Sequence, residues 1–130
     1  MRLLIVRHAK AAAGEPDELR PLTRKGREQA LELGLRLRTE GFAADAVVTS
    51  PLLRARETAA ALGLGEPEVD ERLAPGATPD EVRELALARG ETVVVVGHQP
   101  DCGLIVAALT GAPAPPFPPG GTAFVELGPA

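Results

Sequence analysis

The stretch that decides the fold is MRLLIVRHAK, residues 1–10. Leu3 to Val6 is a continuous run of apolar residues, which is typical of a strand buried in the centre of a sheet. The run stops at Arg7 and His8. Because open α/β sheets bind their ligands at the carboxyl ends of their strands, this pair indicates a candidate ligand site. An isolated Arg-His pair is also an ordinary polar strand end, so the rest of the chain has to supply partners.

Strand-like and helix-like segments alternate along the 130 residues. This alternation predicts a three-layer α/β sandwich, with a mostly parallel central sheet flanked by helices. The length predicts a single domain over residues 1–130. Further strands are expected at residues 45–50, 67–70, 92–96 and 122–127. Helices are expected from the Thr23 cap to about residue 40 and at residues 52–62, 79–89 and 101–110. Pro51 is expected to open the helix at residues 52–62.

The charge of the chain restricts its partners. A formal net charge of −4 argues against nucleic acid or an anionic membrane as a partner, and it makes any local cluster of arginines a focused anion site. The single cysteine, Cys102, excludes an internal disulfide and fits a reducing compartment. We see neither a signal peptide nor a segment of membrane-spanning length, and therefore expect a cytoplasmic protein.

Residues with anion-binding chemistry follow three of the expected strands. Arg7 and His8 end the first, the turn from Ser50 to Arg54 follows the second, and His98 follows the strand at residues 92–96. Because parallel strands end at a common edge, these side chains can meet in one pocket. Two histidines could suggest a metal, but no Cys or carboxylate flanks them and the arginines repel a cation. The combination indicates an oxyanion, above all phosphate.

Four sequence blocks carry a family resemblance: LLIVRHAK (residues 3–10), PLTRKGREQA (21–30), VVTSPLLRARETA (47–59) and VVVVGHQP (93–100). In this order they resemble the successive blocks of the histidine phosphatase superfamily, whose fold is phosphoglycerate mutase-like. The short length and the blocks LRPLT (19–23) and HQPDCGLIVAAL (98–109) are most similar to the SixA-type phosphohistidine phosphatases. The resemblance implies a phosphatase that needs no metal or other cofactor.

The resemblance also implies a role for each matched residue. His8 matches the nucleophile that becomes transiently phosphorylated, and the charges beside it should lower its pKa. Arg7 and Arg54 match the arginines that bind the phosphoryl oxygens. His98 matches the second histidine, a hydrogen-bond donor to the phosphoryl group. Arg20, in the LRPLT block, is a further candidate for substrate binding at the mouth of the site.

The sequence departs from the family at the general acid. Many members place a glutamate where this chain has Pro75, which cannot donate a proton. Glu71 and Asp80 are nearby alternatives, although solvated positions are expected for both. A site without a strong acid suits a phosphoramidate, so we expect a phosphatase that acts on phosphohistidine in a protein. The alternatives are a phosphatase for small phosphate monoesters and a catalytically idle phosphate-binding module.

Overall fold

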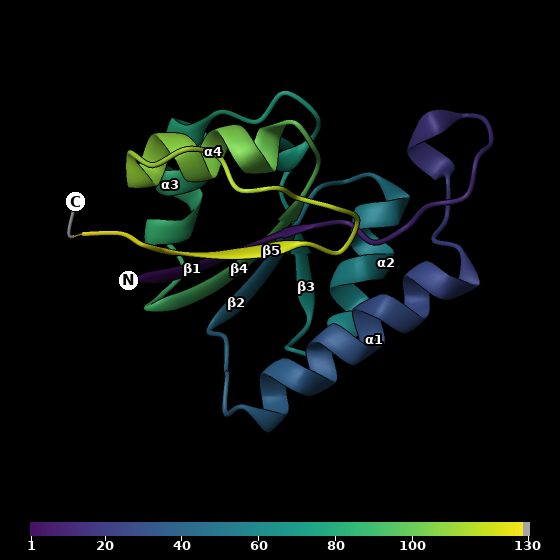
Figure 1. Ribbon diagram of the computed structural model, residues 1–130, viewed down its shortest axis with the longest axis horizontal. Coiled ribbons are helices and arrows are strands. Elements are labelled where there is room, and N and C mark those ends of the chain that lie inside the picture. Colours follow the sequence, from purple (N-terminus) through teal and green to yellow (C-terminus); the bar gives the residue numbers. More distant parts are fainter. Residues whose placement is uncertain (129–130) are drawn as a thin grey trace.

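The central sheet follows the order β3-β2-β4-β1-β5 (Figure 1). The computed structural model describes residues 1–128. Strands β1 to β4 pair in parallel, whereas β5 runs antiparallel beside β1, so the expectation of a mostly parallel sheet is confirmed. The strands are β1 (Arg2–Arg7), β2 (Ala46–Thr49), β3 (Pro67–Val69), β4 (Thr92–Gly97) and β5 (Thr122–Glu126).

Helices cover both faces of this sheet, which confirms the three-layer α/β sandwich. Figure 1 shows α3 and α4 on one face and α1 and α2 on the other. Within residues 1–128, no helix combines the length and apolar character that crossing a bilayer requires. The helices are α1 (Arg24–Thr39), α2 (Leu53–Leu62), α3 (Pro79–Leu87) and α4 (Asp101–Thr110), with short 3-10 turns η1 (Asp17–Leu19) and η2 (Glu71–Leu73).

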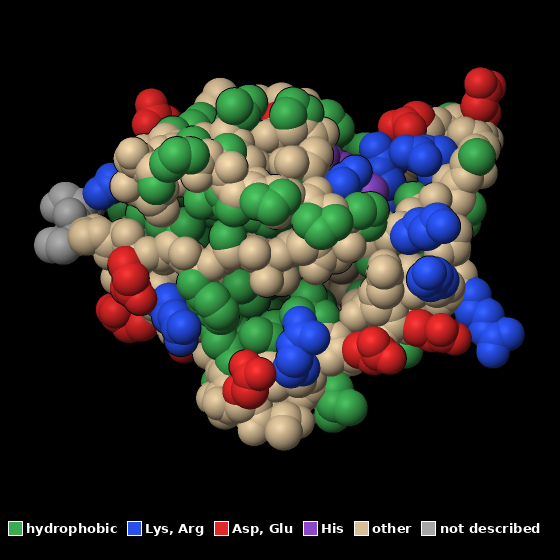
Figure 2. Space-filling view, viewed as in Figure 1, with side chains coloured by type: hydrophobic (Ala, Val, Ile, Leu, Met, Phe, Trp, Pro, Cys, Tyr) green, Lys and Arg blue, Asp and Glu red, His purple; other side chains and the backbone are tan. Residues whose placement is uncertain are grey.

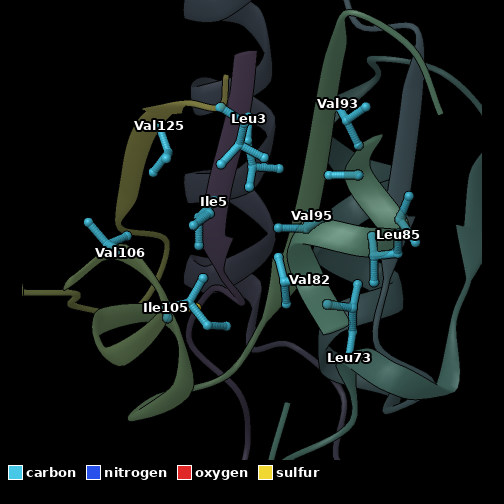
Figure 3. Close-up of a cluster of buried hydrophobic side chains, with 14 of the residues drawn as sticks. Leu3, Ile5, Leu73, Val82, Leu85, Val93, Val95, Ile105, Val106 and Val125 are labelled. Atoms are coloured by element: carbon cyan, nitrogen blue, oxygen red, sulfur yellow. The ribbon is translucent and has the colours of Figure 1, made fainter. Parts of the chain in front are cut away.

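Strand β1 lies between β4 and β5 and is buried on both faces, which explains its continuous apolar run. Leu3 and Ile5 point into the cluster under α3 and α4 (Figure 3). Leu4 and Val6 point to the other face, against α1 and α2. A strand fixed from both sides and along both edges gives Arg7, at its end, a rigid support.

The helix ends follow local signals, with two differences from the sequence prediction. The Thr23 side chain accepts a hydrogen bond from the N–H of Gly26, as expected of the α1 cap. Pro51, however, precedes α2 instead of opening its first turn, because the Ser50 hydroxyl captures the N–H of Leu52 and the helix begins after that turn. Helix α3 ends at Leu87, two residues earlier than predicted.

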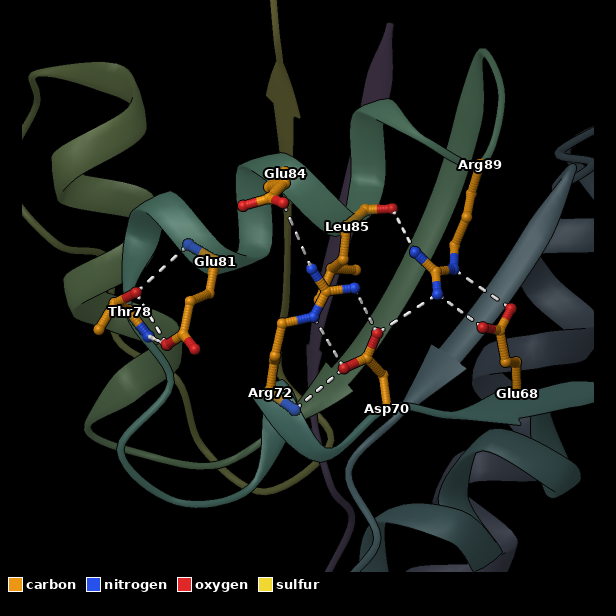
Figure 4. A network of polar contacts seen from close by, with 8 residues as sticks. All are labelled: Glu68, Asp70, Arg72, Thr78, Glu81, Glu84, Leu85 and Arg89. Atoms are coloured by element: carbon orange, nitrogen blue, oxygen red, sulfur yellow. Dashed lines mark hydrogen bonds and ion pairs between the residues drawn. The ribbon is translucent and has the colours of Figure 1, made fainter.

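An ion-pair network explains the early end of α3 and stabilises the segment between β3 and α3 (Figure 4). Arg89, which was expected inside the helix, donates to the carbonyl of Leu85 and to the carboxylates of Glu68 and Asp70. Asp70 also accepts two hydrogen bonds from the Arg72 side chain, which lower its pKa. The network ties the end of β3 to η2, the turn that leads into Pro75.

Candidate active site

The carboxyl ends of β1, β2 and β4 border a pocket of about 490 Å³. All five residues that the sequence singled out line it: Arg7, His8, Arg20, Arg54 and His98. In Figure 2 the histidines lie in a hollow between Lys and Arg side chains. The remaining lining residues are Lys10, Ala11, Asp17, Pro75, Gln99 and Pro119.

His8 follows directly on β1 and is held in one orientation. Its backbone N–H donates to the carbonyl of Gly97 on β4, at 3.0 Å. Its ring Nδ1 lies 2.7 Å from the carbonyl oxygen of Ala9. Because a carbonyl can only accept, the ring proton is inferred to be on Nδ1, and Nε2 keeps its lone pair. Neutral His8 therefore has the tautomer that a nucleophile needs.

The surroundings of His8 keep this ring neutral. Burial is the largest effect and lowers its pKa below 6.5, while the hydrogen bond to Ala9 opposes that change. The positive charges of Arg54, Arg7 and Arg20 lower the pKa further. The expected direction is confirmed, although burial contributes more than the arginines to which the sequence pointed.

Arg54 lies in the first turn of α2 and is buried, with 6% of its surface exposed. Its guanidinium donates to the Asp17 carbonyl at 2.9 Å and to the Asp17 carboxylate at 3.2 Å. The helix around it is tied to the segment after His8, since Thr58 donates to the Arg54 carbonyl and accepts the N–H of Ala9. Arg54 is thus fixed at the side of the pocket next to the nucleophile candidate.

Two further arginines reach the pocket from other segments. Arg7 donates to the carbonyl of Phe117 at 2.9 Å, so the loop before β5 orients it. Arg20 donates through Nε to the Asp17 carboxylate at 2.9 Å and to the Ala12 carbonyl at 3.3 Å. These contacts bring the cations of three chain segments to one edge of the sheet.

Asp17 is a pocket residue that the sequence analysis missed. Burial raises its pKa, but the hydrogen bonds and charges of Arg54 and Arg20 outweigh that effect, so the pKa lies below its ordinary value. The carboxylate is therefore ionised and shares both arginines. Its position three residues before Arg20 was a weak signal for the ion pair between these two, but nothing local indicated Arg54.

His98 follows β4 and faces His8, with ring centroids 5.3 Å apart. Burial is the largest effect on its pKa, followed by the charge that His8 carries when protonated and the charge of Arg54, and together they lower it to about 4. Its Nε2 lies 2.7 Å from the hydroxyl oxygen of Ser50, which follows β2. In the sequence, Ser50 stands out only as the start of a turn, and its contact with His98 spans 48 positions of sequence.

Pro75, Glu71 and Asp80 lie as the sequence predicts. Pro75 lines the pocket, whereas Glu71 and Asp80 are exposed and do not line it. Asp17 is the only carboxylate among the lining residues of the described chain. Residues 1–128 contain no group of three or more His, Cys, Asp or Glu side chains arranged to hold a metal ion.

Comparison with known proteins places this pocket in a family. The family model of the histidine phosphatase superfamily (branch 1) matches residues 3–76, more than half of the chain. The chain belongs to the histidine phosphatase superfamily. The matched region contains Arg7, His8, Arg20 and Arg54, while His98 lies outside it and joins the site through the fold.

Individual known proteins are similar to this one over most of the chain. An uncharacterized protein of Picosynechococcus is 39% identical over 114 residues, covering 79% of this chain and 69% of the relative. The phosphohistidine phosphatase SixA of Escherichia coli is 31% identical over 127 residues, covering 90% and 79%. A solved structure of the protein histidine phosphatase SixA complexed with tungstate superimposes with a TM-score of 0.88, at 29% identity, covering 98% of this chain and 88% of that one.

Proposed function

We propose that this histidine phosphatase superfamily member removes phosphate from phosphohistidine on a protein, through a phosphorylated His8 and without a metal or other cofactor. One observation carries the proposal. Among residues 1–128, four buried side-chain nitrogen or oxygen atoms have no hydrogen-bond partner, and three of them are Arg7 Nε, Arg54 Nε and His98 Nδ1. These three nitrogens belong to side chains that line the pocket around His8.

A phosphoryl group matches this set of unpaired nitrogens. Buried polar groups are normally hydrogen-bonded, so unpaired ones gathered in a single pocket suggest a ligand that satisfies them. Phosphoryl transfer spreads charge over three equatorial oxygens and depends mainly on positioning and charge neutralisation. Arg7 and Arg54 supply guanidinium donors, His98 supplies an imidazole donor, and Arg20 binds the substrate at the mouth. The solved SixA structure is a complex with tungstate, and this supports the proposal that the chain binds an oxyanion.

In the first step, the Nε2 lone pair of His8 attacks the phosphorus of the substrate. The P–N bond of the phosphohistidine breaks, and its electron pair goes to the ring nitrogen of the substrate. A phosphoimidazole that is protonated leaves as neutral imidazole, so this step needs no acid from the enzyme. The carbonyl of Ala9, at 2.7 Å from Nδ1, stabilises the positive charge that His8 gains as it is phosphorylated.

In the second step, water attacks the phosphorus of phospho-His8. The P–Nε2 bond breaks, its electron pair returns to Nε2, and inorganic phosphate leaves. The arginines remain hydrogen-bonded to the equatorial oxygens through both steps, and their fixed charges perform the neutralisation that a metal ion performs in other phosphatases. Each cycle restores neutral His8 and consumes one water molecule.

The absence of a general acid favours phosphohistidine over phosphate monoesters. Pro75 occupies the wall where the family glutamate is expected, and Asp17 is ionised by its arginines. An alkoxide leaving group needs a proton as it departs, whereas protonated imidazole does not. The SixA relatives, at 31% and 29% identity, support the same substrate class.

The experiment uses the fact that the chain contains two histidines. The protein is mixed with a phosphohistidine-bearing protein and quenched rapidly, and the acid-labile phosphate is mapped by mass spectrometry. We expect turnover in EDTA and phosphate on His8, which is absent in His8→Asn and retained in His98→Asn. Turnover of small monoesters alone would favour a phosphatase for small phosphate monoesters. Phosphate binding without any turnover would favour a catalytically idle phosphate-binding module. Loss of activity in EDTA would contradict the metal-free mechanism.

A further inference from the structure

A buried hydroxyl lies behind the second histidine of the pocket. Ser50, at the end of β2, is fully buried, and its Oγ lies 2.7 Å from His98 Nε2. The same oxygen accepts the backbone N–H of Leu52 at 3.1 Å, a contact that the turn into α2 enforces. The hydroxyl is therefore fixed by the backbone on one side and touches the imidazole on the other.

The position of the protons follows from the number of donors and acceptors. A serine hydroxyl has one hydrogen to donate and two lone pairs that accept. Leu52 uses one lone pair, and within residues 1–128 the only other hydrogen-bonding contact of Ser50 Oγ is His98 Nε2. If Nε2 carried a proton, the buried hydroxyl hydrogen would have no acceptor, which is costly. The arrangement that satisfies every Ser50 atom has the hydroxyl donating to an unprotonated Nε2.

We propose that Ser50 is a positioning residue that sets the tautomer of His98, so that its Nδ1–H is the donor to the transferring phosphoryl group. The inference rests on the proposed function and adds a residue that acts through His98. His98 Nδ1 is buried and has no partner among the described residues. With Nε2 occupied by Ser50, Nδ1 is the ring nitrogen left to face the ligand.

The choice of tautomer matters because His98 is neutral. Its pKa of about 4 leaves the ring with one N–H at neutral pH, so it donates from a single nitrogen. A proton on Nδ1 offers a donor to a phosphoryl oxygen. A proton on Nε2 would instead turn a lone pair toward that oxygen and repel it. Ser50 thus decides whether this side chain stabilises or destabilises the transition state.

The first test measures the tautomer directly in the folded wild-type protein. Histidine is labelled with ¹⁵N, and the two ring systems are assigned with His8→Asn, which leaves His98 as the one histidine. At pH 7 we expect a protonated Nδ1 and an unprotonated Nε2 in His98, both in the free protein and after addition of inorganic phosphate. A proton on Nε2 in both states would overturn the proposal, whether or not the protein is a phosphatase.

The second test compares Ser50→Ala and Ser50→Thr with Thr49→Val. Thr49 is also fully buried and its hydroxyl donates to the carbonyl of Ser50, but within the described chain that hydroxyl makes no hydrogen bond to His98. Ser50→Ala should lower kcat by about 10- to 100-fold, with a smaller change in KM, and should change the tautomer signal of His98. Ser50→Thr, which keeps the hydroxyl, should recover most of kcat, and Thr49→Val should keep both kcat and the signal.

These outcomes distinguish a failure of the Ser50 proposal from a failure of the proposed phosphatase function. If wild type turns over phosphohistidine and a folded Ser50→Ala variant keeps its kcat and its His98 signal, Ser50 has no positioning role. If Thr49→Val loses as much activity as Ser50→Ala, the loss is structural and the proposal is wrong. If wild type has no turnover, the proposed function fails, and the ring-proton measurement alone then decides the tautomer.

Discussion

We expect Pro75 to make the leaving group the main determinant of the rate. The residue lines the pocket. The one lining carboxylate of the described chain is Asp17, and hydrogen bonds and charges from Arg54 and Arg20 lower its pKa and keep it ionised. Among the lining residues of the described chain, no carboxylic acid is therefore placed to protonate a departing alkoxide. Because a positioned general acid contributes roughly 10²–10⁴-fold to a rate, we expect alkyl monoesters to react slower than aryl monoesters by about that factor.

The assay is kcat/KM for a series of phosphate monoesters graded by leaving-group pKa, with a phosphohistidine protein as reference. Wild type should show a steep decline as the leaving-group pKa rises. Pro75→Glu should raise kcat/KM for the alkyl esters alone, by up to about 10²-fold, and flatten the series. Pro75→Gln is the matched control, since it changes the backbone in the same way and has similar size but carries no acid.

Two results would refute this reasoning. A flat series for wild type, with chemistry shown to be rate-limiting, would mean that some group already supplies the proton. Asp17→Asn identifies whether that group is Asp17, since the amide cannot donate as an acid but can still accept from the arginines. An equal gain for Pro75→Gln and Pro75→Glu would show that the proline acts through loop shape and not through the missing acid.

Three further predictions concern binding, pH and packing. Arg54→Ala should weaken the binding free energy of phosphate, measured by competitive inhibition, by about 1.5–3 kcal/mol, the value of a charged hydrogen bond. Arg56 is exposed on the same helix, and Arg56→Ala should leave phosphate binding unchanged. Equal effects of the two variants would contradict a specific role of Arg54. The pKa of His98 is about 4 in the folded protein and near 6.5 when unfolded, so the unfolded chain binds more protons between these values. The free energy of unfolding should therefore fall as pH drops from 6.5 toward 4, and less so in His98→Asn, as urea titrations at pH 7 and 5 can measure. Gly34→Ala should destabilise the protein by at least about 1–3 kcal/mol, because its Cβ would overlap a backbone carbonyl of α2. Gly103→Ala in α4, where the nearest atom to the added Cβ is 3.5 Å away, should be neutral or stabilising by up to about 1 kcal/mol. Similar thermal midpoints for the two variants would refute the close packing at Gly34.

The parts of the fold that sequence predicted depend on local chemistry. The apolar run of β1, the Thr23 cap and the alternation of strands and helices are visible within a few neighbouring residues, and the structure confirms each of them. Helix α4 has the predicted bounds, Asp101–Thr110, because Gly111 at φ +73° ends it. The meeting of Arg7, His8, Arg20, Arg54 and His98 also followed, since parallel strands carry their ends to one edge.

The contacts that sequence did not predict join distant segments. Arg54 and Asp17 are 37 positions apart, and Ser50 and His98 are 48 apart. No periodicity, cap or turn relates such pairs, since they depend on which residues the sheet order brings together. The early end of α3 has the same cause, because Arg89 is drawn toward Glu68 on β3, 21 positions earlier.

The pocket concentrates costs that the rest of the fold has to offset. Buried guanidinium and imidazole nitrogens without partners oppose folding, and Arg7, Arg54 and His98 each contribute one such nitrogen. Asp17 relieves part of this cost by sharing Arg54, but its side chain is 63% exposed and reaches the pocket from a short turn. A phosphoryl group that replaces the Asp17 carboxylate at Arg54 would exchange one anion for another, and so needs little reorganisation of the rigid elements. The nucleophile candidate, by contrast, is supported by β1, by Gly97 and by the Ala9 carbonyl, none of which has to move. The exposed carboxylate thus lies on the acidic turn and the fixed contacts surround His8, which agrees with the function that we propose, in which a protein-borne phosphate enters the site and is positioned for attack.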